Sequence, residues 1–364
     1  MLLRDTVISV NTDILAKNME AVTAMVGPNV AVMAVVKANG YGHGLDEAAT
    51  VFMAHGARYL AVATLDEALT LRKKNANWPI LILGYTPDWA LPLVVEYDLS
   101  QMLFSAHQAR LLDAAAAERG RRVRVHLKVD SGFHRLGTAD VNELYAICTL
   151  PHLETEGIFT HLALVNDAED ARQVAVFTAV ADALESCGMR FRYRHVADSI
   201  SAVESPWYHM DMIRPGALLY GMTSHTRGSI NVRPALTMET RISQIHAVKT
   251  GEGVGYDYLW RAPRNTRVAT LPFGYADGYP RSLREKGYVT IRGVKCPFAG
   301  VICMDQCMVD ISNVPDAREG DPAIIYGDGS GNTLSVAEAA ALAGTNKNEI
   351  LSRLTVRPPR VYGQ

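Results

Sequence analysis

Cysteine pairs, long apolar runs and blocks of like charge are scarce in this sequence, and each scarcity excludes a class of protein. The five cysteines are an odd, scattered set without CxxC spacing, so we expect reduced thiols and not a disulfide framework. No stretch of 18 apolar residues occurs, which predicts no membrane-spanning helix. The net charge is −2 and no long run has one sign, so nothing favours nucleic acid or an anionic membrane surface as a partner.

Two further shortages concern targeting and metals. Residues 1–5 lack the charged start and apolar core of a signal peptide, so we expect a cytoplasmic protein. Cys303 and Cys307 have no histidine nearby in the sequence, and we predict no metal site. What remains is an ordinary globular composition, with 48% hydrophobic residues over 364 positions. This length indicates two domains or one large barrel with an addition.

Short apolar segments alternate with amphipathic helical stretches through the first two thirds of the chain. The strand candidates are residues 30–36, 59–63, 79–84, 99–103, 123–129, 155–161, 192–197 and 212–214. A helix is predicted over 170–187, ending before Gly188. Eight strand–helix units predict an α/β fold of the (β/α)8 TIM-barrel type. A doubly wound open sheet is the alternative, although it usually has fewer strands.

The last third of the chain is rich in β-type runs punctuated by Gly and Pro. These runs cover residues 237–248, 267–272, 288–292, 301–311 and 322–326. One helix is predicted at 335–343, with Ser335 as its N-cap. We therefore expect a barrel over residues 12–234 and a mainly-β domain over 235–364. Residues 1–11 are expected to add a strand to the second domain.

Lys37 stands at the end of the first predicted strand, between an apolar run at 30–36 and a Gly-rich turn at 38–44. Partial burial disfavours an ammonium ion and lowers the pKa of its amine. A neutral amine can form a Schiff base with an aldehyde or ketone. A lone lysine at a strand end can equally extend its ammonium group to solvent. The surrounding residues must therefore show which of these two roles Lys37 has.

Other polar side chains also follow the predicted strands, where a barrel places its chemistry. They are Lys128, Asp130, Arg135, His161, Asp198, Ser199 and Arg214. The loops after strands seven and eight commonly hold a phosphate in barrels, and Ser199 and the backbone near Gly216 could supply donors there. A Schiff-base lysine, a phosphate cradle and several cations together suit pyridoxal 5′-phosphate (PLP).

Segment 34–44, AVVKANGYGHG, resembles the cofactor-lysine motif of the alanine racemases, which are fold-type III PLP enzymes. Further motifs similar to that family follow in family order at residues 128–137, 160–161, 214–216, 274–279 and 303–306. The resemblance implies that Lys37 carries PLP and serves as one of two acid/base groups. It also implies that Tyr41 and Ser199 contact the phosphate, with backbone donors from Gly216 and Ala217.

The resemblance assigns four more barrel residues. His161 would lie near the pyridine ring, and Arg214 would donate to the pyridine nitrogen. Arg135 would contact the cofactor's phenolic oxygen and help to bind the substrate carboxylate. Lys128 matches a lysine that is carbamylated in some family members, where it orients the arginine.

The second acid/base group is expected to be a tyrosine. Counting back about 15 residues from Tyr275 reaches Trp260, which cannot act as a general base. Tyr258 lies two positions upstream and is our predicted second base, with Tyr256 or another residue near Trp260 as the alternative. In the family this tyrosine, with a methionine and an aspartate, reaches into a partner's barrel. Met304 matches that methionine and Asp305 matches that aspartate, so the resemblance implies that both bind the substrate. It also implies a homodimer with shared active sites.

Two departures from the family pattern concern the pocket. Asp198 stands in the place of an asparagine, and an aspartate near a phosphate is unfavourable unless it is protonated or turned away. Val356 stands in the place of a tyrosine, which is expected to remove a hydroxyl and widen the pocket.

The predicted function is racemisation of alanine, with D-alanine supplied for peptidoglycan. A serine or broad-specificity racemase is the alternative. Two weaker alternatives are a non-catalytic PLP-binding protein and a fold-type III decarboxylase. The decarboxylases use a cysteine from the partner subunit, for which Cys303 and Cys307 are the candidates here.

Overall fold

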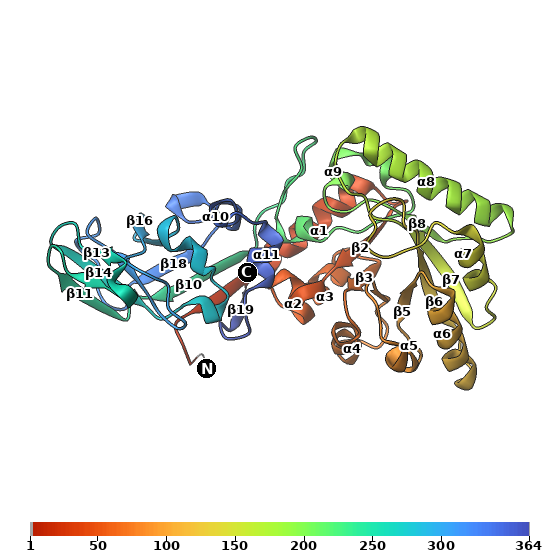
Figure 1. Ribbon diagram of the computed structural model, residues 1–364, viewed down its shortest axis with the longest axis horizontal. Coiled ribbons are helices and arrows are strands. Elements are labelled where there is room, and N and C mark those ends of the chain that lie inside the picture. The colour runs from red at the N-terminus through yellow and green to blue at the C-terminus, as the bar shows by residue number, and fades with distance from the viewer. Residues whose placement is uncertain (1–2, 364) are drawn as a thin grey trace.

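The computed structural model describes residues 3–363 and shows two parts along its long axis, a barrel and a β-rich domain (Figure 1). Within these residues the barrel has eight parallel strands in the order β8-β7-β6-β5-β4-β3-β2-β9. They are β2 (Ala31–Val35), β3 (Tyr59–Val62), β4 (Ile80–Ile82), β5 (Ser100–Leu103), β6 (Val123–Lys128), β7 (Leu153–Phe159), β8 (Tyr193–His195) and β9 (Met212–Ile213). All eight predicted strands are present, and the open-sheet alternative is wrong.

The barrel is closed by backbone hydrogen bonds between the β8 and β9 segments. The amide of Asp211 donates to the carbonyl of Arg194 at 3.1 Å, and that of Arg214 donates to Ala197 at 2.9 Å. These bonds bring the residues that follow β8 beside those that follow β9. The chemistry-bearing ends of strands far apart in the sequence therefore meet at one rim.

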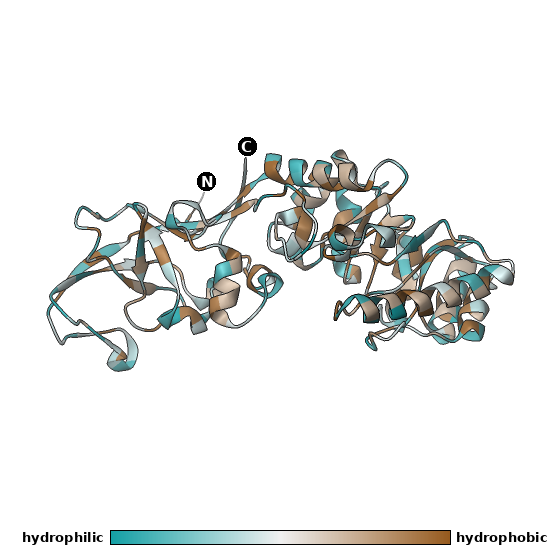
Figure 2. Cartoon of the chain, turned by 90° about the horizontal axis from the view of Figure 1, so that it is seen from above, coloured by the Kyte–Doolittle hydropathy of each residue, from teal (hydrophilic) through white to brown (hydrophobic). Residues whose placement is uncertain are grey.

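Helices surround the strands of the barrel (Figure 1). They are α1 (Thr12–Val26), α3 (Leu45–Ala54), α4 (Leu65–Lys74), α5 (Leu91–Glu96), α6 (Ala106–Glu118), α7 (Val141–Cys148) and α8 (Asp167–Ser186), with the short α9 (Ser201–Glu204). In Figure 2 the barrel helices carry hydrophobic and hydrophilic residues in turn, as expected for helices that cover a sheet with one face. Helix α8 starts three residues before its predicted start because the Asn166 side chain caps it, accepting from the amide of Glu169 at 2.9 Å.

The second domain of the described chain is mainly β. Its six-stranded sheet has the order β16-β15-β18-β10-β1-β19, and a three-stranded sheet has the order β11-β14-β17. The strands are β1 (Val7–Asn11), β10 (Leu236–Arg241), β11 (Gln244–Val248), β12 (Gly253–Val254), β13 (Trp260–Arg261), β14 (Thr266–Leu271), β15 (Tyr288–Ile291), β16 (Val294–Pro297), β17 (Cys307–Asp310), β18 (Pro322–Tyr326) and β19 (Arg360–Gly363). The N-terminal strand β1 pairs antiparallel with β10, so it joins this sheet as predicted.

Several elements of the second domain differ from their sequence-based prediction. The predicted run 237–248 is two strands, because the chain turns between Arg241 and Gln244. Only Cys307–Asp310 of the run 301–311 is a strand. Helix α10 (Val336–Ala343) is capped by Ser335 as predicted, but a further helix, α11 (Lys347–Ser352), was not predicted. Within residues 3–363 no helix is both long and apolar enough to span a membrane.

Candidate active site

A cavity of about 520 Å³ opens at the carboxyl-terminal ends of the barrel strands. Its wall contains most of the residues singled out in the sequence, namely Lys37, Tyr41, Lys128, Arg135, His161, Asp198, Ser199, Arg214, Gly216 and Ala217. Asn348 of α11 also lines it, so the second domain contributes to the cavity. A cavity of this size, with a few convergent polar groups, is typical of a cofactor site.

Lys37 begins a left-handed turn. Residues 38, 39, 40 and 41 all have positive φ, between +50° and +58°. The amide of Gly40 donates to Val36 at 2.9 Å and that of Gly42 donates to Ala38 at 3.0 Å. A left-handed conformation costs about 1–2 kcal/mol for each residue that is not glycine, so the surrounding structure must hold this turn in place.

The electrostatic surroundings of Lys37 favour its neutral amine. Burial lowers the pKa of Lys37, and the nearby cation of Arg135 lowers it further, while Glu67 opposes them. The expected partly buried lysine at a strand end is therefore present.

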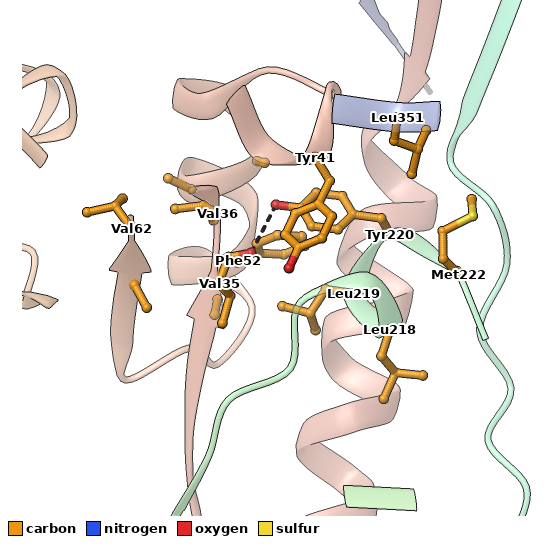
Figure 3. Close-up of a cluster of buried hydrophobic side chains, with 14 of the residues drawn as sticks. Val35, Val36, Tyr41, Phe52, Val62, Leu218, Leu219, Tyr220, Met222 and Leu351 are labelled. Carbon is orange, nitrogen blue, oxygen red and sulfur yellow. Dashed lines mark hydrogen bonds between the residues drawn. The ribbon is translucent and has the colours of Figure 1, made fainter. Parts of the chain in front are cut away.

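Tyr41 lines the cavity and packs into a cluster of buried hydrophobic side chains (Figure 3). Its ring centroid lies 5.0 Å from that of Tyr220, whose hydroxyl donates to the carbonyl of Val35 at 3.3 Å. Burial, with the charge of Asp198, raises the pKa of Tyr41 to about 12. The Tyr41 phenol therefore stays protonated near neutral pH and can donate a hydrogen bond.

The turn around Gly216 forms a cradle beside the Tyr41 hydroxyl. A Cβ at Gly216 would lie 2.4 Å from Tyr41 Oη, so only glycine leaves the backbone open here. Ser199 Oγ accepts from the amides of Gly216 at 2.9 Å and Leu218 at 3.3 Å, which leaves its own proton free to donate.

Asp198 lines the same cavity, but its Oδ1 is engaged in local hydrogen bonds. Its Oδ1 accepts from the amides of Ile200 and Ser201, each at 3.0 Å, and from Ser201 Oγ at 2.9 Å. The carboxylate thus accepts from the backbone amides of the residue before α9 and of its first residue. This geometry explains how an aspartate is accommodated beside the cradle.

Arg214 is buried at the base of the cavity. Its Nη2 donates to the carbonyls of Thr160 at 2.7 Å and Val196 at 2.9 Å, and its Nη1 lies 3.1 Å from His195 Nδ1. Burial lowers the pKa of Arg214 to about 10, so the guanidinium remains charged at neutral pH. Burial, followed by the charge of Arg214, lowers the pKa of His161 to about 3, so that imidazole is neutral.

Lys128 and Arg135 occupy different depths of the cavity. Lys128 is buried, and its Nζ donates to the carbonyl of Val129 at 2.8 Å. Burial, with the charge of Arg214, lowers the pKa of Lys128 to about 7. Arg135 is exposed at the rim, with its guanidinium carbon 4.4 Å from the ring centroid of Phe133.

The remaining predicted site residues lie outside this cavity. Tyr256 is 68% exposed, Tyr258 is 58% exposed and Met304 is 54% exposed, and all three are in the second domain with Trp260 and Asp305. Val356 is 86% exposed and does not line the cavity, so its expected widening of the pocket is not seen in the single chain.

His195 and His126 are buried site neighbours that sequence reasoning missed. His195 Nε2 lies 2.9 Å from His126 Nδ1, directly behind Arg214. Their one signal in the sequence is a histidine inside each of the predicted strands 123–129 and 192–197.

These features define a class of protein, namely a barrel enzyme with an appended β-domain. In its barrel, a lysine at a strand end shares one cavity with an anion cradle and a buried arginine. Residues 10–224 match the family model "Alanine racemase, N-terminal domain" and residues 235–362 match "Alanine racemase, C-terminal domain". The chain belongs to the alanine racemase family.

Relatives and solved structures support this membership over the whole chain. An alanine racemase of Desulforamulus reducens is 39% identical, with 97% of each chain covered, and one of Helicobacter pylori strain Shi470 is 38% identical, with 100% of each covered. The structure of alanine racemase from Streptomyces lavendulae matches with a TM-score of 0.95 and 31% identity, over 100% of this chain and 98% of that one. The structure of alanine racemase from Bacillus anthracis with bound L-Ala-P matches with a TM-score of 0.94 and 28% identity, over 100% of this chain and 96% of that one.

Proposed function

We propose that this protein is a PLP-dependent racemase that interconverts L- and D-alanine. The observation that carries the proposal is Lys37, a partly buried amine with a lowered pKa, set between the Gly216 cradle and Arg214 in a chain of this family. We also propose that the reaction takes place in the cytoplasm and supplies D-alanine for peptidoglycan.

The residues present fit PLP. The cradle offers the hydroxyl protons of Tyr41 and Ser199 and a backbone that a Cβ at Gly216 would close, which suits a phosphate group. Ala217 would contribute to the same cradle. Arg214 would hold the pyridine nitrogen, with His161 beside the ring. When bound, the cofactor spreads the negative charge that develops at the substrate Cα.

Racemisation needs a proton to leave one face of Cα and another to arrive on the opposite face, so two positioned groups are required. Lys37 serves as one of them, because burial and the nearby charge of Arg135 lower the pKa of its amine and so favour the neutral form that can accept a proton. Arg214 keeps its own proton, since a guanidinium does not readily release one, and it therefore donates a hydrogen bond without protonating the ring. Arg135 at the rim is suited to the substrate carboxylate.

The tyrosines predicted as the second group lie outside the cavity wall of the single chain. Tyr258 is the predicted residue, but its ring packs closely over Gly253, where an added Cβ would lie 2.3 Å from it, and lies 5.5 Å from the guanidinium carbon of Arg261. Tyr256 presents a more exposed phenol on the same turn, η4 (Tyr256–Tyr258). These contacts favour Tyr256 as the second acid/base group, with Tyr258 as the alternative.

A homodimer with shared sites follows from this arrangement. The exposed side chains of Tyr256, Met304 and Asp305 would be supplied to the barrel of a second copy. We propose that Met304 and Asp305 contact the substrate there, and that Lys128 is carbamylated and orients Arg135.

The alternatives have weaker support. The curated relatives reported above are alanine racemases, and Val356 lies outside the cavity, so nothing favours serine or a broader range. A PLP-binding protein without turnover would not need the second domain. A decarboxylase would need a reachable cysteine, but Cys307 is buried and Cys303 is half-buried.

Turnover of D-alanine in deuterium oxide tests the function. A two-base racemase incorporates deuterium at Cα and forms L-alanine, and D-serine and D-lysine run in parallel define the substrate range. Deuterium exchange without inversion would mean that the second acid/base group is missing, and faster turnover of serine would replace alanine as the substrate.

A further inference from the structure

Glu67 of α4 lies beside the lysine turn and binds it through the backbone. Its Oε1 accepts from the amide of Ala38 at 2.6 Å, and its Oε2 accepts from the amide of Ala63 at 2.9 Å. Ala38 directly follows Lys37, and Ala63 directly follows strand β3. One carboxylate thus joins the lysine turn to the neighbouring barrel strand.

The turn that Glu67 binds needs such a constraint. Ala38, Asn39 and Tyr41 have positive φ without being glycine, and a strained backbone of this kind persists only where its surroundings fix it. Its far end is held by the second domain, where Arg360 Nε donates to the carbonyl of Gly42 at 3.0 Å. Glu67 is the side chain that holds the near end, next to the lysine itself.

The charge of Glu67 also acts on Lys37. The Glu67 carboxylate raises the pKa of Lys37 against the larger lowering by burial and by Arg135. The other ionisable groups in the cavity wall are Tyr41, Lys128, His161, Asp198 and Arg214.

We propose that Glu67 is a positioning residue, which fixes the direction of Lys37 by clamping Ala38 to β3 and keeps a negative charge near the lysine nitrogen. This role rests on the proposed function, because it concerns the lysine that carries PLP.

The test compares Glu67→Gln and Glu67→Ala with the control Asp66→Asn, an exposed neighbour in the first turn of the same helix. Three quantities are measured for each full-length protein: the fold by circular dichroism, the affinity of the apoprotein for PLP, and the pH midpoint of the absorbance of the bound cofactor. Loss of the charged acceptor should weaken PLP binding by about tenfold. Loss of its charge should lower the pH midpoint by about half a unit, because a carboxylate favours the protonated nitrogen. Asp66→Asn should match the unsubstituted protein in all three.

The outcomes separate the two proposals. If Glu67→Gln equals the unsubstituted protein in PLP affinity and pH midpoint, Glu67 is not a positioning residue. If every Glu67 variant unfolds while Asp66→Asn folds, the carboxylate is a scaffold residue and the proposal is again overturned. If the unsubstituted protein does not bind PLP at Lys37, the proposed function fails first and this role with it.

Discussion

Arg214 and His195 fix one another's hydrogen bonding, with Arg214 Nη1 3.1 Å from His195 Nδ1. A guanidinium can only donate, so His195 Nδ1 accepts and the ring proton lies on Nε2. That proton is donated to His126 Nδ1 at 2.9 Å, which places the proton of His126 on Nε2, 3.6 Å from Glu156 Oε2. A single buried arginine therefore sets the tautomers of two histidines, while its Nη2 donates to the backbone carbonyls of Thr160 and Val196.

Arg214→Glu should change what the enzyme does with its substrate. The guanidinium that retains its proton is replaced by a group that can transfer one, so we expect racemisation to fall by about 100-fold or more and the share of transamination to rise. Pyruvate formed per racemisation event measures this share, and the exposed Arg110→Glu is the charge-matched control. An unchanged ratio of pyruvate to racemised alanine would contradict the role of Arg214.

The two tyrosines of the 256–258 turn give a paired test. Tyr256→Phe should lower kcat for alanine by about 10²–10⁴-fold, the usual range for loss of a general acid or base. Tyr258→Phe should keep near-normal turnover, because its ring is used in packing against Gly253 and beneath Arg261. The opposite result would return the second-base assignment to Tyr258, and full activity in both would remove tyrosine from the mechanism.

Lys128 should take up carbon dioxide in a pH-dependent way. Carbamylation needs the neutral amine, and the pKa of Lys128 is lowered to about 7 by burial, so the neutral form dominates at pH 8 and not at pH 6. Native mass spectrometry in bicarbonate should show one added CO₂ at pH 8 that diminishes toward pH 6 and is absent in Lys128→Arg. An equal adduct in Lys128→Arg would place the modification on another group.

Acid should destabilise the apoprotein through its buried histidines. Burial lowers the pKa of His43 to about 4 and of His161 to about 3, and it also lowers the pKa values of His126 and His195. Because these folded-state pKa values lie below the unfolded value near 6.5, the stability is fully present above about pH 6.5 and is lost as pH falls toward 4 and 3.

Each such histidine contributes a slope of up to about 1.4 kcal/mol per pH unit. Urea denaturation at pH 7, 6 and 5 should therefore give a steadily falling free energy of unfolding, and His43→Gln should reduce that slope. An equal free energy at pH 7 and pH 5 would show that these imidazoles are not buried in the neutral form.

The sequence predicted the barrel because several of its strands, such as β2, β3 and β4, are short apolar runs that alternate with helical segments. It did not predict α11, whose six residues at 347–352 are too few for a clear helical period. The left-handed turn after Lys37 was also beyond prediction, since Ala38 and Tyr41 have no preference for positive φ and are held there by tertiary contacts.

The site was predictable where each residue ends its own strand, as for Lys37, His161 and Arg214. It was not predictable where distant strands meet. His126 and His195 are 69 positions apart, and only the curvature of the barrel brings their rings together. The second base stays a prediction, because Tyr256 and Tyr258 do not line the cavity of their own chain.

The covalent attachment of the cofactor tests the central claim most directly. The purified protein is saturated with PLP, reduced with borohydride, digested and analysed by mass spectrometry, with Lys128 as the internal competitor in the same cavity. The account predicts one label, on the peptide that contains Lys37, and none in Lys37→Ala. A label on Lys128 or on any other residue, or no label at all, would contradict it.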